Sequence, residues 1–269
     1  MKRLLLTVLL LLASSAWAGP EEDAIAAAAA AHDRGDYETA WKIAKPAVAK
    51  GEAWAQSFLG DIYRVGRAVP KNDAEAAKWF KLAAAQGYAD AQFKLGVQYF
   101  LGRGVVQDQK EAVQWYRLAA SQEHPSALTT LAFAFRFGMG VDKDESEALK
   151  IMRFAAERGD ATAQNEVGAY FANGQGLLQD YAEAVKWYRL AAAQGYAPAQ
   201  YNLGLMYGKG QGVPMDDVRA HMWFNLAAAK GDAGAVKNRD QATKMMTPQQ
   251  MAEAQKLARE CQARNFKGC

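Results

Sequence analysis

The residue types that carry most enzyme chemistry are scarce and scattered in this 269-residue chain. Its three histidines are His32, His124 and His221, and its two cysteines are Cys261 and Cys269. A protein metal site needs three or four ligands that converge on one point. Because the histidines stand far apart along the chain, we predict no metal site and no cofactor.

Three patterns could suggest catalysis or phosphate binding, and each has a simpler structural explanation. The segment 208–212, Gly-Lys-Gly-Gln-Gly, superficially resembles a phosphate-binding loop, but it follows a predicted helix and lacks the Gly-Lys-Ser/Thr ending. Acidic pairs three residues apart, such as Asp108 and Glu111, recur at predicted helix starts, where carboxylates cap the backbone. No serine lies in a nucleophile-elbow context and no cysteine has an evident histidine partner. We therefore predict that the protein is not an enzyme.

The N-terminus has the pattern of a cleavable signal peptide. Lys2 and Arg3 precede an apolar run at 4–12, and Ala-Trp-Ala at 16–18 fits signal peptidase cleavage before Gly19. The run is too short to remain as a membrane anchor, so we expect no integral membrane segment after cleavage. No cysteine follows that could carry a lipid. The segment 1–18 therefore predicts a periplasmic or secreted protein.

The charge balance gives no reason to expect a polyanionic partner. Cleavage after residue 18 leaves 30 of the 32 basic residues against 29 acidic residues. A chain that is close to neutral lacks the long-range field that attracts nucleic acid or an anionic membrane. We predict that it binds neither.

A repeat of 36 residues runs through most of the chain. Five units align without gaps, at 53–88, 89–124, 125–160, 161–196 and 197–232. Spacing this regular is typical of a solenoid protein. The alignment is marked by tryptophans at Trp79, Trp115, Trp187 and Trp223, and by glycines at Gly60, Gly96, Gly168 and Gly204.

Each unit has the pattern of two helices. In the fifth unit Leu203 and Tyr207 share one helix face, Gly210 favours the helix end, and Asp216 favours the start of the next helix. The other units place Asn72, Asp108, Asp144 and Asp180 at this start, each with a glutamate three residues on, which predicts a capping-box-like pair. The fifth unit has Arg219 in place of that glutamate.

The helices should pack closely at the repeated glycine. Glycine within a helix costs about 1 kcal/mol relative to alanine. Its return in four units predicts that a neighbouring helix passes too close for a methyl group, and Ala132 in the third unit predicts a wider crossing. We also expect each second helix to bury its tryptophan.

These residues carry a resemblance to a known family. The segment 199–207, Ala-Gln-Tyr-Asn-Leu-Gly-Leu-Met-Tyr, followed by the glycine turn at 210–213, Trp223-Phe224 and Ala227-Ala228, resembles the Sel1-like repeat. The third unit departs most, with Leu128, Ala132 and Ile151-Met152. The resemblance implies an all-α fold, a right-handed α-solenoid of stacked helical hairpins related to the tetratricopeptide repeat.

The two ends are expected to close the solenoid with more polar helices. Residues 19–52 have the pattern of a degenerate repeat, and 233–269 of two further helices, the second starting at Thr247-Pro248. An even cysteine count in an exported chain predicts a disulfide between Cys261 and Cys269.

In helical-hairpin solenoids the first helices line the concave surface. Non-core positions there predict a partner-binding face, and exposed aromatic residues make good anchors. The alternative is that these aromatic side chains pack against the adjacent repeat. The candidate residues are Asp61, Arg64, Phe93, Phe100, Phe133, Arg136 and Tyr201.

The resemblance implies an exported scaffold or adaptor that binds a protein or peptide in its concave groove. One alternative is a polysaccharide-associated envelope assembly factor, whose aromatic residues would stack on sugar rings. Another is a β-lactam-binding or β-lactam-hydrolysing enzyme, although that subgroup has a disulfide in each repeat and this chain does not.

Overall fold

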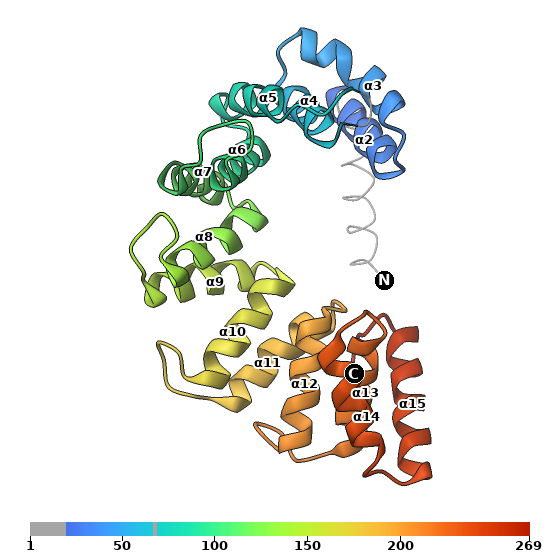
Figure 1. Ribbon diagram of the computed structural model, residues 1–269. Helices are drawn as coiled ribbons and strands as arrows, with labels where there is room; N and C mark the ends of the chain where they lie inside the picture. The colour runs from blue at the N-terminus through green and yellow to red at the C-terminus, as the bar shows by residue number, and fades with distance from the viewer. Residues whose placement is uncertain (1–19, 67–68) are drawn as a thin grey trace, which may run out of the picture. The chain divides into compact units, whose positions relative to one another are not determined.

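The computed structural model describes residues 20–66 and 69–269, and the predicted signal peptide at 1–18 lies outside this range. The described residues form fourteen α-helices and no strand, which confirms the predicted all-α helical solenoid (Figure 1). The helices are α2 (Pro20–Asp33), α3 (Tyr37–Ala49), α4 (Ala53–Val65), α5 (Asp73–Ala85), α6 (Ala89–Leu101), α7 (Gln109–Ser121), α8 (Pro125–Phe137), α9 (Glu145–Glu157), α10 (Ala161–Asn173), α11 (Tyr181–Ala192), α12 (Ala197–Lys209), α13 (Asp217–Ala228), α14 (Ala233–Thr243) and α15 (Pro248–Ala263).

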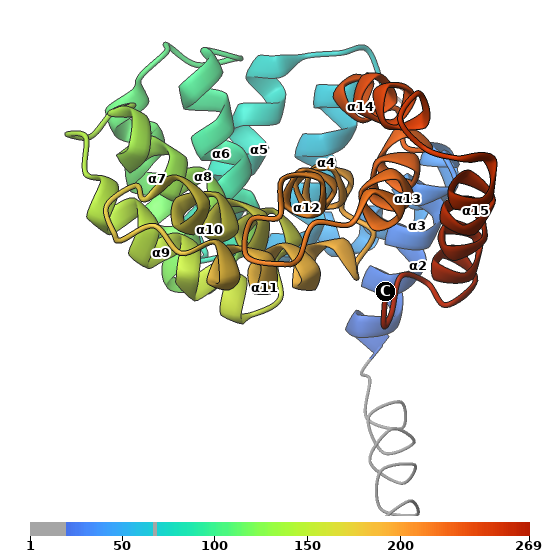
Figure 2. The same ribbon diagram turned by 90° about the horizontal axis from the view of Figure 1, so that it is seen from below.

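The helices belong to two compact units, an N-terminal unit that ends at His124 and a C-terminal unit that begins at Pro125. Helices consecutive in the chain pack side by side from α2 to α7 in the N-terminal unit and from α8 to α14 in the C-terminal unit (Figure 1). We call α4, α6, α8, α10 and α12 the first helices of the five repeats, and α5, α7, α9, α11 and α13 the second helices. In the C-terminal unit, α14 and α15 both pack against α13 (Figure 2).

The second helices begin where the sequence predicts, but only one half of each capping box forms. The N-cap side chain accepts its hydrogen bonds, whereas the backbone N–H of the N-cap residue does not bond to the glutamate. The Asp108 carboxylate accepts hydrogen bonds from the backbone N–H groups of Lys110 and Glu111, at 2.9 and 3.0 Å. The backbone N–H of Asp108 donates instead to the Tyr99 carbonyl at 2.9 Å, so the glutamate is not needed to satisfy it. The same backbone bond forms at Asn72, Asp144, Asp180 and Asp216.

The repeated glycine makes room for an aromatic ring. A Cβ atom on Gly96 would lie 2.6 Å from the Tyr116 ring, and one on Gly204 would lie 2.5 Å from the Phe224 ring. Each ring belongs to the second helix of the same repeat, so the obstacle is a side chain more than a backbone. In the third repeat Ala132 takes the glycine position and the flexible Met152 takes the ring position.

These rings, and not the tryptophans, are the regularly buried aromatic residues of the second helices. Phe80, Tyr116, Tyr188 and Phe224 are all buried. Trp79, Trp115 and Trp187 are only half-buried, and Trp223 alone is buried as predicted. The prediction failed because neighbouring aromatic residues in a helix point in different directions, and the ring that faces the glycine takes the core position.

Glutamine side chains join the two helices of a repeat to each other and to the turn that precedes the repeat. A glutamine at the end of a second helix donates to a backbone carbonyl and to a glutamine side chain at the start of the preceding first helix. Gln122 does so with Gly87 at 2.9 Å and Gln92 at 2.8 Å. Equivalent bonds run from Gln86 to Gly51 and Gln56, and from Gln194 to Gly159 and Gln164.

The C-terminal helix is fixed at both ends. Thr247 and Gln250 form a reciprocal capping box at the start of α15. At the other end, Cys261 is buried and forms a disulfide with Cys269. No helix in the described ranges has both the length and the apolar character needed to cross a bilayer.

Candidate functional site

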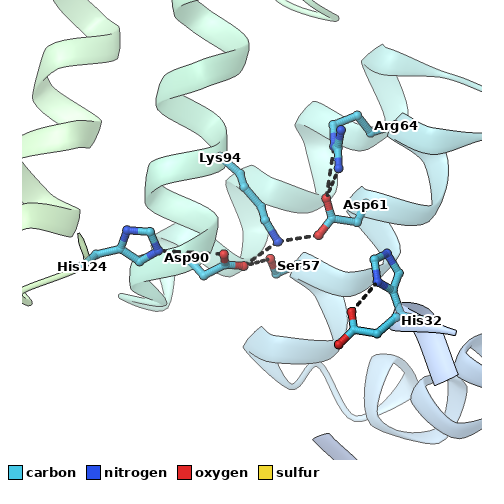
Figure 3. Close-up of polar contacts among 8 residues, drawn as sticks. His32, Ser57, Asp61, Arg64, Asp90, Lys94 and His124 are labelled. Carbon is cyan, nitrogen blue, oxygen red and sulfur yellow. Dashed lines mark hydrogen bonds and ion pairs between the residues drawn. The ribbon is translucent and has the colours of Figure 1, made fainter. Parts of the chain in front are cut away.

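A cluster of charged side chains lies on the first helices of the N-terminal unit. The Lys94 ammonium group of α6 sits between two carboxylates, those of Asp61 on α4 and Asp90 on α6 (Figure 3). Its Nζ atom is 2.6 Å from Oδ2 of Asp90, and it also donates a hydrogen bond to Asp61. The lysine therefore links two consecutive repeats through ion pairs.

Both carboxylates have further donors. Asp61 accepts hydrogen bonds from Nε and Nη2 of Arg64, at 3.1 and 2.9 Å, and Asp90 accepts one from Ser57 Oγ at 2.9 Å. Asp61 is 9% exposed, whereas the Arg64 side chain is 42% exposed. The buried carboxylate therefore fixes a guanidinium group that remains open to solvent. We call Ser57, Asp61, Arg64, Asp90 and Lys94 the charged cluster.

The electrostatics keep Lys94 charged. Burial lowers the pKa of Lys94, but the carboxylates of Asp61 and Asp90 outweigh it, so the pKa lies above its ordinary value of 10.5. Burial also raises the pKa of the neighbouring Tyr88, helped by Asp90. At neutral pH the cluster thus holds a protonated lysine next to a neutral phenol.

A cavity of about 120 Å³ adjoins the charged cluster. Helix α2 forms one wall with Ile25 and Ala28. The aromatic rings of Trp54, Phe58 and Tyr88 line the cavity, together with the residues of the charged cluster other than Arg64. The arrangement offers an apolar recess with fixed polar groups at its edge.

His124 lies at one side of the cluster. Its ring stacks on Phe93 at 5.1 Å, and its Nε2 atom is 4.0 Å from Oδ1 of Asp90. Burial lowers the pKa of His124, and Asp90 opposes that shift. His32 on α2 contacts Phe58 edge-on at 5.8 Å. Within the part of the chain that the structure describes, no three or more His, Cys, Asp or Glu side chains are grouped to hold a metal ion.

The C-terminal unit has its own charged pair between first helices. Arg136 of α8 pairs with Glu166 of α10 at 2.7 Å. The guanidinium group also lies over the rings of Tyr170 and Phe137, at 5.1 and 5.3 Å. Phe137 itself is 61% exposed, so an arginine and an exposed ring are held together on this surface.

The predicted site residues divide into charged residues and half-buried aromatic residues. Asp61 and Arg64 belong to the charged cluster, and Arg136 makes the equivalent pair in the other unit. Phe93, Phe100, Phe133 and Tyr201 are half-buried. The contacts of the aromatic residues include Phe93 with Tyr116, Phe133 with Phe137, and Tyr201 with Phe224 and Asn238.

Sequence reasoning missed Asp90, Lys94 and Phe137. Asp90 and Lys94 are four residues apart in α6, a spacing that favours an ion pair on a helix and could have been read. The bond between Lys94 and Asp61 spans 33 positions and depends on how the repeats stack. Phe137 is the last residue of α8, where an apolar side chain gives no signal of exposure.

The comparison with protein families matches five consecutive segments to the Sel1 repeat, at 55–88, 89–124, 125–160, 161–196 and 197–232. These segments cover more than half of the chain. The chain belongs to the Sel1 repeat family.

A solved Sel1 repeat protein shares this fold, and two further solved proteins are similar to parts of the chain. A Sel1 repeat protein from Oxalobacter formigenes is 32% identical, with a TM-score of 0.75, and the match covers 90% of this chain and 96% of that chain. A protective antigen, c5321, of uropathogenic Escherichia coli strains is 26% identical over 93% of this chain and 70% of its own, with a TM-score of 0.40. The immunity protein PA5088 from Pseudomonas aeruginosa is 19% identical, with a TM-score of 0.51 and coverage of 74% and 75%. The comparison with curated proteins gave no match.

Membership indicates the general kind of activity. Sel1 repeat proteins generally mediate protein–protein interactions and are typically non-enzymatic. The charged cluster and the cavity beside it are therefore considered first as a binding surface for another protein.

Proposed function

We propose that this Sel1 repeat protein is an exported, non-catalytic scaffold that binds a protein or peptide through the first helices of its repeats. The observation that carries the proposal is the ion-paired Lys94, which fixes Asp61 and Asp90 beside an aromatic cavity. This surface combines arginine, tryptophan and tyrosine, the residue types that dominate protein-binding hot spots.

The charged cluster is preorganised for binding. Asp61 holds the Arg64 side chain by two hydrogen bonds while about two fifths of that side chain stays exposed. A side chain that is already ordered loses less conformational entropy when a partner binds. Arg64 can therefore donate to a carboxylate or carbonyl of a partner at low entropic cost.

The size of the cavity favours a side chain of a partner over a whole small-molecule substrate. Small-molecule sites usually occupy about 300–1,000 Å³. The cavity beside the charged cluster holds about 120 Å³. An apolar side chain inserted among Trp54, Phe58 and Tyr88 would fit this recess while the adjacent peptide backbone reaches Arg64. The comparisons favour neither the polysaccharide alternative nor the β-lactam alternative.

Export is part of the proposal. The signal-peptide pattern at 1–18 supports it, as does the disulfide between Cys261 and Cys269, since disulfides persist in oxidising compartments. We infer a periplasmic or secreted location, where the partner would also be found.

Site-specific photo-crosslinking in intact cells tests the binding surface. A benzoylphenylalanine residue replaces Arg64 or Phe137 on the first helices, and Leu82 on the second helix α5 serves as the matched control. Leu82 is 50% exposed, so the probe is accessible there too. We expect the same partner to be captured from Arg64 or Phe137 and not from Leu82.

A second variant checks the role of the charged cluster. Two proteins are compared, both with the crosslinker at position 137. In the first the charged cluster is intact, and in the second Lys94→Met removes the cation that links Asp61 and Asp90. Because the proposed binding surface includes the charged cluster, Lys94→Met should lower the yield of the adduct at position 137 severalfold. Equal capture from Leu82 and Arg64, or no defined partner from either first-helix position, would contradict the proposal.

A further inference from the structure

The fifth repeat breaks the charge pattern of the second helices. In the first, third and fourth repeats a glutamate pairs with a lysine three residues on: Glu75 with Lys78, Glu147 with Lys150, and Glu183 with Lys186. The fifth repeat has Arg219 and Met222 at these positions. Arg219 thus puts a basic side chain where the other repeats have glutamate, and Met222 puts an apolar side chain where three of them have the paired lysine.

Arg219 lies beside a second arginine. Arg189 of α11 donates from Nη2 to the Tyr207 hydroxyl at 2.9 Å, and the Arg219 Cζ atom is 5.7 Å from the centre of the same Tyr207 ring. Arg219 also has a carboxylate, Asp216, at 3.6 Å. Within the described residues, no carboxylate lies in ion-pair range of Arg189. The two guanidinium groups therefore lie near the same phenol, and Asp216 pairs with Arg219.

These groups line a pocket of about 400 Å³ between α11, α12, α13 and the C-terminal tail. No Asp or Glu side chain is among the described residues that line it. Its apolar wall includes Leu190, which is 50% exposed, together with Trp223 and Phe266. The indole Nε1 of Trp223 is buried and has no hydrogen-bond partner, an uncommon state for a donor.

The disulfide holds one wall of the pocket. Cys269 and Gly268 line it, and Cys269 is bonded to Cys261 on α15. In the turn before them, Asn265 and Phe266 have φ values of 50° and 64°, a backbone conformation that residues other than glycine rarely adopt. The Phe266 ring also lies 4.9 Å from the Lys230 ammonium group. The tail is therefore tied down where it completes the pocket.

We propose that this pocket binds the C-terminus of a protein chain that ends in an aromatic or large aliphatic residue. Two arginines and a phenol hydroxyl suit a carboxylate, because guanidinium groups form strong charge-assisted hydrogen bonds with it. The apolar wall suits the side chain. The carboxylate and the apolar side chain of one C-terminal residue can together reach the arginines and the apolar wall of a pocket of about 400 Å³.

Three pentapeptides test this proposal by NMR titration of the full mature protein. The first has the sequence acetyl-Gly-Ser-Gly-Ser-Phe with a free C-terminus, the second is its C-terminal amide, and the third ends in serine with a free C-terminus. We expect the first to bind with a Kd of about 1 mM or tighter. It should shift the indole resonance of Trp223 and the side-chain Nε resonances of Arg189 and Arg219. The amide and the serine peptide should each bind at least about tenfold more weakly.

Matched arginine variants locate the site. Arg189→Gln and Arg219→Gln should each raise the Kd of the phenylalanine peptide about tenfold, whereas Arg117→Gln, at the position equivalent to Arg189 in the second repeat, should leave it unchanged. All three residues are exposed, and circular dichroism confirms that the variants fold. Equal binding of the amide, or unchanged affinity in both Arg189→Gln and Arg219→Gln, overturns the proposal. The pocket and the charged cluster have no residue in common and belong to different units. Lys94→Met should therefore not alter this titration, so the two proposals fail independently.

Discussion

The ring of Tyr116 occupies the space that a side chain on Gly96 would need. A Cβ atom there would lie 2.6 Å from Cε1 of the ring and 3.1 Å from the Ala112 carbonyl oxygen. The same relationship joins Gly60 to Phe80, Gly168 to Tyr188 and Gly204 to Phe224. Glycine and ring therefore act as a pair in four of the five repeats.

The first prediction tests this pairing. Gly96→Ala should lower the free energy of unfolding by about 1–2 kcal/mol, because the overpacking at the ring exceeds the gain in helix propensity. Urea unfolding followed by circular dichroism measures the change. The double variant Gly96→Ala, Tyr116→Met copies the third repeat, which has Ala132 and Met152.

The double variant should recover part of the loss, with a coupling energy of about 1 kcal/mol between the two positions. Strictly additive effects would show that the glycine is not required by the ring.

A second prediction concerns the glutamine bonds that join the two helices of a repeat to each other and to the turn before them. Gln122→Ala removes the hydrogen bonds to Gly87 and Gln92 and should cost about 1–2 kcal/mol in the free energy of unfolding. The third repeat has lost both members of this pair together, with Leu128 and Arg158 in their places. The double variant Gln92→Leu, Gln122→Arg should therefore cost less than the sum of the single variants. If urea unfolding shows that the double variant loses as much free energy of unfolding as the two single variants together, Gln92 and Gln122 do not act as a pair.

The third prediction is a pH dependence from His221. Burial, followed by the charge of Arg239, lowers the pKa of His221 from its ordinary value of 6.5. The folded chain thus favours the neutral ring, and this stability is present above pH 6.5 and is lost as the pH falls toward the folded-state pKa. His221→Gln should flatten the decline in the free energy of unfolding below pH 6.5, as measured by urea unfolding at several pH values.

Thr243→Val is the control for that measurement. It removes the 3.1 Å contact with His221 Nε2 but keeps the imidazole. This variant should lower stability at every pH and retain the decline in acid. If His221→Gln keeps the slope of the wild type, the buried imidazole does not cause the acid dependence.

The fourth prediction concerns the disulfide. Cys261 and Cys269 are eight positions apart, and closing a loop of this length stabilises the chain by about 2.5 kcal/mol in the chain-entropy model. Reduction should raise amide hydrogen exchange in the last turns of α15 and in 264–269. Exchange in α4 to α7 of the N-terminal unit, which lacks cysteine, serves as the internal reference. Unchanged exchange at the C-terminus after full reduction would mean that the helix holds the tail without the bond.

Local patterns in the sequence were sufficient to predict the helices and their order along the chain. Asp108, Asp144 and Asp180 cap the second helices as expected, because a cap needs only the backbone of the next three residues. The prediction was weaker wherever a side chain could point in more than one direction. Trp115 and Tyr116 are adjacent and similarly apolar, and only packing against Gly96 decides that Tyr116 takes the core position.

In the candidate sites, too, some residues were predictable from local sequence and others depended on how the helices pack. Asp61 and Arg64 were predicted because their positions face away from the packing stripe of α4. Lys94 was missed, since its bond to Asp61 joins groups 33 positions apart. Arg219 was noticed as a break in the capping pattern, but its approach to Tyr207 could not be read from the pattern.

The sequence by itself determined the repeat length, the helical class, the caps and the family, because each depends on residues close together in the chain or on their regular return. The tertiary structure decided which charges meet and which residues line the two pockets. The Lys94 ammonium and the Arg189 guanidinium acquire their neighbours only when separate helices pack, and that geometry depends on the packing of many side chains at once.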